Sequence, residues 1–196
     1  MARAMNRSFR SVLFSRFGAA GQAQAMAGTQ TPIDAGDVAA MTAYAERVVI
    51  VPGYGMAVAQ AHKIRELSQR LIERGVKVRF AIHPVAGRMP GHMNVSLAEA
   101  GAPCDLIVVT DEVNPDFADT AVSLVIGAND VVDPVARTDP ASRIYGMPIP
   151  DVIDAKHAIA IKRGTGTGFA GIDNALFYAP NTRTLYGDGA EMAGGW

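Results

Sequence analysis

The sequence predicts an α/β protein built on a doubly wound, six-stranded parallel sheet, and two observations favour this fold. An apolar run at about 47–51 ends at a glycine turn, after which apolar residues recur at helical spacing and a second strand pattern follows at 76–82. Such a strand, helix, strand unit favours parallel pairing, because its crossover is right-handed and covers one face of the sheet. Further strand patterns are separated by helices or long crossovers, so the expected strand order is 3-2-1-4-5-6, as in Rossmann-like domains.

The first half of the chain supplies the elements of this unit in order. Residues 37–47 predict a short helix that leads into the first strand. The helix after the glycine turn is predicted over 56–74, and Gly75 provides its stop. Residues 76–82 alternate between polar and apolar side chains, as a strand does, and a further short helix is predicted at 92–100.

The second half of the chain supplies shorter elements between longer loops. The strands predicted after the second are 105–109, 123–126, 157–161 and 182–186. One or two helical turns are expected at 114–120, between the third strand and the fourth. The proline-rich excursion at 139–150 is too long for a simple connection, which indicates a functional loop.

The composition of the chain excludes several classes of protein. Apolar residues make up 49% and charged residues 19% of the chain, and the net charge is −1, so neither nucleic-acid binding nor disorder is indicated for its body. No apolar run approaches the ~20 residues that cross a bilayer, so no transmembrane span is expected. The single cysteine, Cys104, excludes an intramolecular disulfide, indicates a reducing compartment and is expected to be a small buried residue before a strand.

The first 33 residues differ in composition from the rest of the chain. They carry four arginines and no acidic residue, and a short apolar cluster is followed by a stretch rich in glycine, alanine and glutamine. An organellar targeting peptide, an amphipathic helix on a membrane surface and a linker are the three interpretations. A flexible basic linker or juxtamembrane segment is preferred because the apolar cluster is short. The chain is therefore divided into this segment, 1–33, and one domain, 34–196.

Ligands of a doubly wound sheet bind beyond the carboxyl ends of its strands, so the loops there hold the candidate site. The loops, all rich in glycine, are 53–55, 83–91, 127–130, 162–169 and 187–188. In the first, Gly53 allows a tight turn, and Gly55 lets the backbone approach a pyrophosphate at a helix N-terminus. The third position of this fingerprint is Val58 rather than glycine, so an ordinary strand-to-helix loop is the alternative.

The charged residues beside these loops favour a phosphorylated dinucleotide. The second strand ends in Ile82 and His83, where an NAD site places an acidic residue for the ribose 2′-hydroxyl. Lys162 and Arg163 precede a run of alternating glycines and offer a point charge and a planar fork to a doubly charged phosphate. These residues imply NADP(H), unless they are a solvated basic pair at a strand end.

Other polar residues leave alternatives open. Arg88 is either a second phosphate ligand or a surface arginine, and Asp130 either bonds the ribose or the nicotinamide carboxamide or caps the turn after the fourth strand. His62 and His157 are expected at the surface, and no histidine has metal-ligand spacing. No nucleophile or acid/base motif is visible, so the domain is expected to hold a redox cofactor without substrate chemistry of its own.

Several runs of this sequence resemble the NADP(H)-binding domain, domain III, of proton-translocating nicotinamide nucleotide transhydrogenase. They are 53–58, 83–94, 127–130, 162–163 and 168–171, and the likeness covers about 34–188. In that family the domain is the C-terminal part of the β subunit and follows the membrane domain, which favours the juxtamembrane interpretation of 1–33. The resemblance implies direct hydride transfer between NAD(H) on a separate domain I and NADP(H) on this chain, while proton movement through membrane domain II biases the site.

The resemblance also implies roles for individual residues. Lys162 and Arg163 would hold the 2′-phosphate, 85–90 and the first glycine turn would surround the pyrophosphate and nicotinamide, and 162–169 would form a lid over NADP(H) bound in reversed orientation. The expected cofactor-binding residues are Gly53, Tyr54, Gly55, Val58, His83, Val85, Ala86, Gly87, Arg88, Met89, Pro90, Gly127, Ala128, Asn129, Asp130, Val131, Lys162, Arg163, Gly164, Thr165, Gly166, Thr167, Gly168, Phe169, Gly187 and Asp188. No catalytic side chain and no metal are expected.

The resemblance finally implies a location for the chain, and two rival functions stand against the one it implies. The chain would be a peripheral domain of a membrane complex, on the cytoplasmic face of the bacterial inner membrane or the matrix side in mitochondria, and inactive until domain I docks. The first rival is an NADPH-sensing module without hydride transfer. The second is a self-contained NADPH-dependent reductase, which would need a substrate domain or a proton donor.

Overall fold

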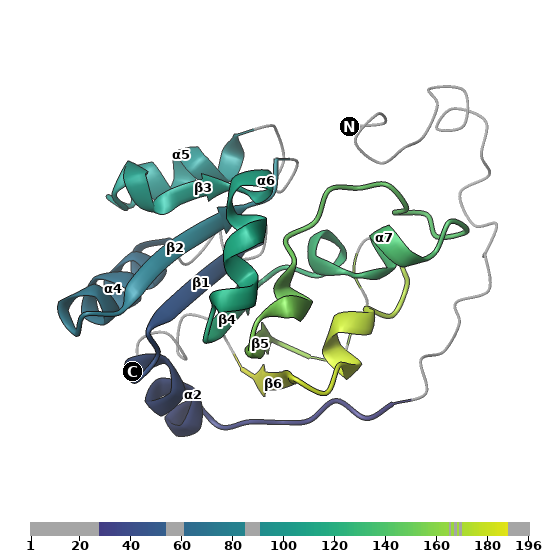
Figure 1. The fold of residues 1–196 in the computed structure, drawn as a ribbon, viewed down its shortest axis with the longest axis horizontal. Helices are drawn as coiled ribbons and strands as arrows, with labels where there is room; N and C mark the ends of the chain where they lie inside the picture. The colour runs from purple at the N-terminus through teal and green to yellow at the C-terminus, as the bar shows by residue number, and fades with distance from the viewer. Residues whose placement is uncertain are drawn as a thin grey trace.

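Six parallel strands form one sheet within residues 28–53, 61–84, 91–164, 166, 168 and 170–187, which this computed structural model describes. The strands are β1 (Arg47–Pro52), β2 (Lys77–Ile82), β3 (Ile107–Val109), β4 (Val122–Ile126), β5 (His157–Lys162) and β6 (Thr182–Tyr186). Their order is β3-β2-β1-β4-β5-β6, which confirms the predicted doubly wound topology (Figure 1). The order reverses between β1 and β4, so these strands mark the switch point at which such sheets bind ligands.

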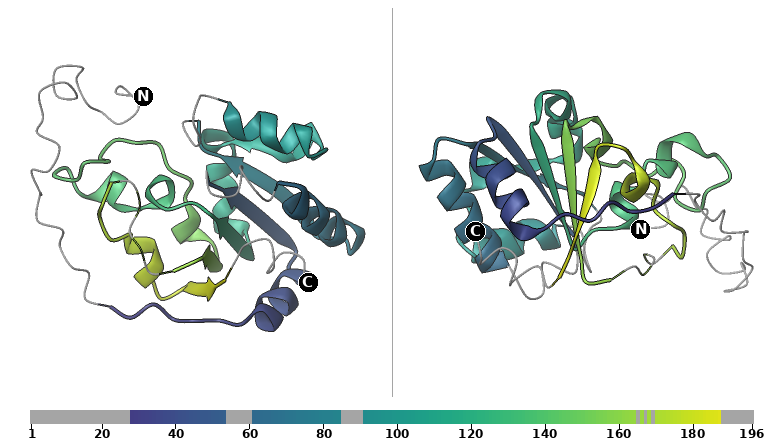
Figure 2. Two further views of the ribbon diagram at one scale, coloured as in Figure 1. Left: turned by 180° about the vertical axis from the view of Figure 1, so that it is seen from behind. Right: turned by 90° about the horizontal axis from the view of Figure 1, so that it is seen from below.

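Two cores, one on each face of the sheet, enclose the strands. The described helices are α2 (Ala35–Ala43), α4 (Ala61–Glu73), α5 (His92–Glu99), α6 (Thr110–Val113) and α7 (Val135–Thr138), and the 3-10 turns are η1 (Cys104–Leu106), η2 (Asn114–Asp119), η3 (Asp130–Val132), η4 (Val152–Asp154) and η5 (Ala175–Tyr178). α2, α4 and α5 share a core with Ile50 of β1, whereas Phe117 of η2 and Phe177 of η5 share the other core with Val49. Figure 2 shows helices on both faces of the sheet. Burial on both faces explains why β1 and β4 are nearly continuous apolar runs. Among the helices described, none is both long enough and apolar enough to cross a membrane.

Most element predictions are confirmed, with shifts of a few residues at their ends. α2 begins earlier than predicted because Asp34 caps it, its carboxylate accepting a hydrogen bond from the Asp37 N–H at 2.9 Å. It also ends earlier, at Ala43, four residues before β1 begins. The helix after the glycine turn is described as α4, since 54–60 lie outside the described residues. The segments 1–27 and 188–196 lie outside them as well, so most of the predicted linker stays a prediction.

The third strand is shorter than predicted, and the prediction that Cys104 is buried is wrong. Residues Cys104–Leu106 form the turn η1, so β3 begins only at Ile107. This turn precedes a strand at the edge of the sheet, where the thiol is exposed rather than enclosed by neighbouring strands. The crossover after β3 is also more helical than predicted, because α6 continues directly into η2.

A short extended segment, residues 28–33, lies beside β6, and we call it the strap. The Ile33 N–H donates to the Thr184 carbonyl at 3.1 Å, and the Thr184 N–H donates to the Thr31 carbonyl at 2.8 Å. Pro32 and Thr184 are thereby paired in a parallel bridge. The strap thus covers the outer side of β6 along the edge of the sheet (Figure 1).

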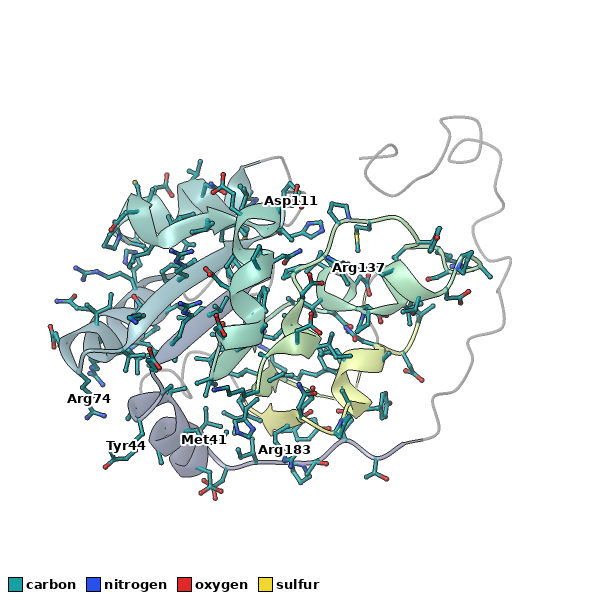
Figure 3. All side chains as sticks on the ribbon, viewed as in Figure 1. Met41, Tyr44, Arg74, Asp111, Arg137 and Arg183 are labelled. Carbon is teal, nitrogen blue, oxygen red and sulfur yellow. The ribbon has the colours of Figure 1, made fainter. Side chains whose placement is uncertain are left out.

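The proline-rich excursion folds into a compact unit. Its small core, to which α7 and the segment after β5 contribute, contains Ala136, Ile144, Met147 and Ile149, with Ala170 and Ile172 packed against them. Arg137, labelled in Figure 3, forms an ion pair with Asp151 at 2.8 Å. The Asn114 side chain of η2 donates to the Ile149 carbonyl and accepts from the Asp151 N–H, both at 3.1 Å. The excursion is therefore tied to the main domain and supports the residues that follow β5.

Candidate functional site

The backbones of two predicted loops meet at the switch point between β1 and β4. Gly53 follows β1, and its N–H donates to the Ile126 carbonyl of β4 at 2.8 Å. A Cβ at Gly53 would overlap the Gly127 carbonyl oxygen and the backbone of Ala128. Glycine is therefore required at this position by the close approach of the two loops.

Asp130, in the loop after β4, holds the segment that follows β5. Its carboxylate accepts a hydrogen bond from the Ala170 N–H at 2.7 Å. A Cβ at Gly168 would overlap the same carboxylate, so the two segments are in direct contact. The side chain thus reaches out of its own turn to a residue 40 positions away, a contact that neither predicted role of Asp130 included.

Two more side chains strengthen this connection, and sequence reasoning missed both. Asn174 donates from its side-chain amide to the Asn129 carbonyl at 2.8 Å. Asp133 accepts N–H bonds from Val135 at 3.0 Å and from Ala175 at 3.3 Å. Neither residue directly follows a strand, and the only local signal was the Asp-Pro pair that begins at position 133, which is typical of a turn.

Asp133 is a buried acid within this connection. Its side chain is fully enclosed, and its Oδ2 has no hydrogen-bond partner among the residues that the structure describes. Burial raises the pKa of Asp133 to about 6, because the charged form loses its hydration. The two N–H bonds oppose this rise, and the nearby carboxylate of Asp130 adds to it. The folded protein therefore carries an unfavourable negative charge here at neutral pH.

Replacing Asp133 by asparagine is expected to stabilise the fold by about 1–2 kcal/mol at pH 7. The protonated carboxyl is favoured in the folded state, so stability falls as the pH rises from the unfolded pKa of 3.8 to the folded value of about 6. Asparagine keeps the acceptor without the charge. Urea unfolding should show the gain at pH 7 and little of it at about pH 4, whereas Asp119→Asn, at an exposed position, should change neither value. A gain of equal size at both pH values would contradict the raised pKa.

Lys162 ends β5 with its ammonium group partly buried. Nζ lies 4.1 Å from the centroid of the Phe177 ring and donates to the Gly166 carbonyl at 3.4 Å. Burial lowers the pKa of Lys162, and the carboxylate of Asp173 opposes that shift. A Cβ at Gly164 or Gly166 would meet nothing within 4 Å. A cation therefore lies at the carboxyl edge of the sheet, next to glycines with open space beside them, an arrangement that fits an anionic ligand group.

His83 connects the end of β2 with the excursion. Its imidazole is almost fully buried and donates a hydrogen bond to the Pro148 carbonyl. Burial lowers the pKa of His83, and that hydrogen bond opposes the shift. His62 and His157 are exposed, as predicted.

The predicted site residues that the structure describes lie at the carboxyl ends of the strands or in the loops that follow them, at one edge of the sheet. They are Gly53, His83, Gly127, Ala128, Asn129, Asp130, Val131, Lys162, Arg163, Gly164, Gly166, Gly168 and Gly187. The Gly187 N–H donates to the Lys162 carbonyl at 2.9 Å, which joins the ends of β6 and β5. The predictions for Tyr54, Gly55, Val58, 85–90, Thr165, Thr167, Phe169 and Asp188 concern positions outside the described residues.

Comparison with known proteins gives two findings. The profile of a family described as NAD(P) transhydrogenase beta subunit matches residues 1–194. The chain is also 50% identical over 198 residues to two sequences named NAD(P) transhydrogenase subunit beta, one from Rhodospirillum rubrum and one from a strain of that species. These alignments cover 98% of this chain and 43% of each relative, so the chain spans less than half the length of those relatives.

Proposed function

Because the chain belongs to the NAD(P) transhydrogenase beta subunit family, we propose that it is the NADP(H)-binding component of such an enzyme. In this proposal hydride passes directly between NAD(H) on a separate domain I and NADP(H) on this chain. A membrane domain II couples the exchange to proton translocation. The chain then lies at the cytoplasmic face of the bacterial inner membrane, or on the matrix side in mitochondria, as a peripheral domain of the complex.

The observation that carries this proposal is the Lys162 ammonium at the carboxyl end of β5, next to Gly164 and Gly166, which have open space beside them. Arg163, the next residue, adds a second cation. At the end of β2, where an NAD site holds an acid, the chain has Ile82 and His83. A cation pair at one strand end and no acid at the other favour a ribose 2′-phosphate over a 2′-hydroxyl.

The residues of this chain bind and orient in the proposed mechanism, because NADP(H) itself supplies the hydride chemistry. Lys162 and Arg163 bind the 2′-phosphate. Asp130 fixes the segment after β5 against the loop after β4, and Gly53 keeps the loops at the switch point in contact. Direct hydride transfer requires no acid, base or nucleophile from the protein, in agreement with the lack of such a motif in the sequence.

The proposal predicts turnover only when both nucleotide-binding components are present. Mixing this chain with an NAD(H)-binding domain I, NADPH and the acetylpyridine analogue of NAD is expected to give reduction of the analogue, followed by its absorbance. Either component alone should give none. Binding of NADPH without turnover in the mixture would favour the sensor module, and oxidation of NADPH by a small carbonyl compound with this chain alone would favour the self-contained reductase.

A further inference from the structure

The Lys162 side chain is held at both ends by groups that are themselves fixed. Its backbone is set by the pairing of β5 with β6, in which Lys162 lies opposite Tyr186 and its carbonyl accepts the Gly187 N–H. Its ammonium lies over the face of the Phe177 ring. A lysine has a flexible four-carbon stem, so a contact of the ammonium group decides the position of the charge.

The Phe177 ring is a rigid partner for this cation. It is almost fully buried in the core of one sheet face and belongs to the turn η5. That turn is itself capped, because the Asn174 side chain accepts the Leu176 N–H at 2.8 Å and Asp133 accepts the Ala175 N–H. The ring therefore has little freedom to follow the lysine, and the lysine head must adapt to the ring.

An aromatic face suits a lysine whose charge is to be used on a ligand. The negative face of the ring attracts the ammonium without cancelling its charge, and the N–H groups that point away from the ring stay available as donors. Of the described residues, Gly166 takes one donor through its carbonyl, and Asp173 acts at longer range on the charge. A carboxylate in the place of the ring would instead neutralise the cation before any anion arrived.

We propose that Phe177 is a positioning residue that holds the Lys162 ammonium for the phosphomonoester of a phosphorylated dinucleotide, and so contributes to the preference for NADP(H) over NAD(H). This inference rests on the proposed function, because it needs Lys162 to bind the 2′-phosphate. It assigns the preference partly to a buried residue that does not touch the ligand.

The test compares two leucine substitutions at buried phenylalanines of the same core. Phe177→Leu removes the ring under Lys162, and Phe117→Leu makes the same change in η2, whose ring belongs to that core but lies under no described cation. Dissociation constants for NADPH and NADH are measured by titration. Phe177→Leu is expected to weaken NADPH binding about three- to tenfold with NADH binding unchanged, whereas Phe117→Leu should leave the ratio of the two constants unchanged. Equal losses for both nucleotides in Phe177→Leu would overturn the inference.

A second variant separates this inference from the proposed function. Lys162→Met removes the charge and keeps the stem, and Phe177→Leu added to it should cause no further loss of NADPH affinity. If Lys162→Met leaves the ratio of NADPH to NADH affinity unchanged, the 2′-phosphate assignment itself fails. If Lys162→Met lowers that ratio but Phe177→Leu does not, only the role of Phe177 fails.

A spectroscopic measurement on the unsubstituted chain covers the case in which Phe177→Leu does not fold. The ε-methylene protons of Lys162, observed by NMR with carbon-labelled lysine, are expected to be shifted upfield by the ring current of Phe177, unlike those of the exposed Lys156. Adenosine 2′-monophosphate should perturb the Lys162 signal, and adenosine should not. A Lys162 signal at the position of an exposed lysine would overturn the inference.

Discussion

Charge reversal at Lys162 is expected to weaken NADPH binding by about 100-fold or more and to leave NADH binding within a few-fold of its original value. A hydrogen bond to a charged group contributes about 1.5–3 kcal/mol, and a glutamate would add repulsion between like charges. NADH lacks the 2′-phosphate, so the substitution removes no hydrogen bond to it and adds no repulsion. Titration of both nucleotides against Lys162→Glu and the unsubstituted chain measures the difference.

Lys156 provides a matched control for that measurement. It precedes β5 at the opposite end of the same strand, where it is exposed, and its N–H donates to the Thr120 carbonyl. Lys156→Glu changes the net charge by the same amount, so it reports any long-range effect of charge on nucleotide binding. Equal losses for NADPH and NADH in Lys162→Glu, or the same loss of NADPH in both variants, would remove Lys162 from the 2′-phosphate site.

Substitution of Gly53 by alanine is expected to cost about 3 kcal/mol of unfolding free energy. The new methyl group would overlap backbone atoms of Gly127 and Ala128, and backbone cannot move aside as the end of a flexible side chain does. Because Gly53 is hydrogen-bonded to Ile126, relief of the overlap would also strain the pairing of β1 with β4. Urea unfolding followed by circular dichroism measures the loss.

Gly164→Ala is the control for this second prediction. A methyl group at Gly164 meets nothing within 4 Å, so its effect on stability is expected to lie within about 0.5 kcal/mol of zero. A Gly53→Ala protein as stable as the Gly164→Ala protein would show that the loops at the switch point are not in fixed contact.

Strand positions were predictable because they depend on local patterns, and the strand order followed from the arrangement that doubly wound sheets share. The apolar runs of β1 and β4 follow from burial on both faces, and Gly75 ends α4 with a φ of 85°, in the left-handed region where glycine is favoured. The placement of the candidate loops at one sheet edge then follows from parallel pairing alone. The Lys162 and Arg163 pair was recognised for the same reason, because it directly follows a strand.

The hydrogen bonds and packing contacts that hold those loops together were not predictable, because they join residues that are distant in sequence. Asp130 and Ala170 are 40 residues apart, and Asn174 and Asn129 are 45 apart. The ring beneath Lys162 comes from η5, which no periodicity in the sequence marks. Cys104 shows the converse limit, since a small residue before a predicted strand was expected to be buried, and a turn at the sheet edge exposes it.

The strap has a consequence for association between molecules. An open edge of a β-sheet invites strand addition from another chain, which leads to aggregation. Two groups of the strap face β6, and both are hydrogen-bonded to the backbone of Thr184. They are the Thr31 carbonyl and the Ile33 N–H. The outward-facing position between them is Pro32, which has no N–H to offer to an incoming strand. The strap therefore closes one edge of the sheet and replaces it with a border that is poorly suited to intermolecular pairing.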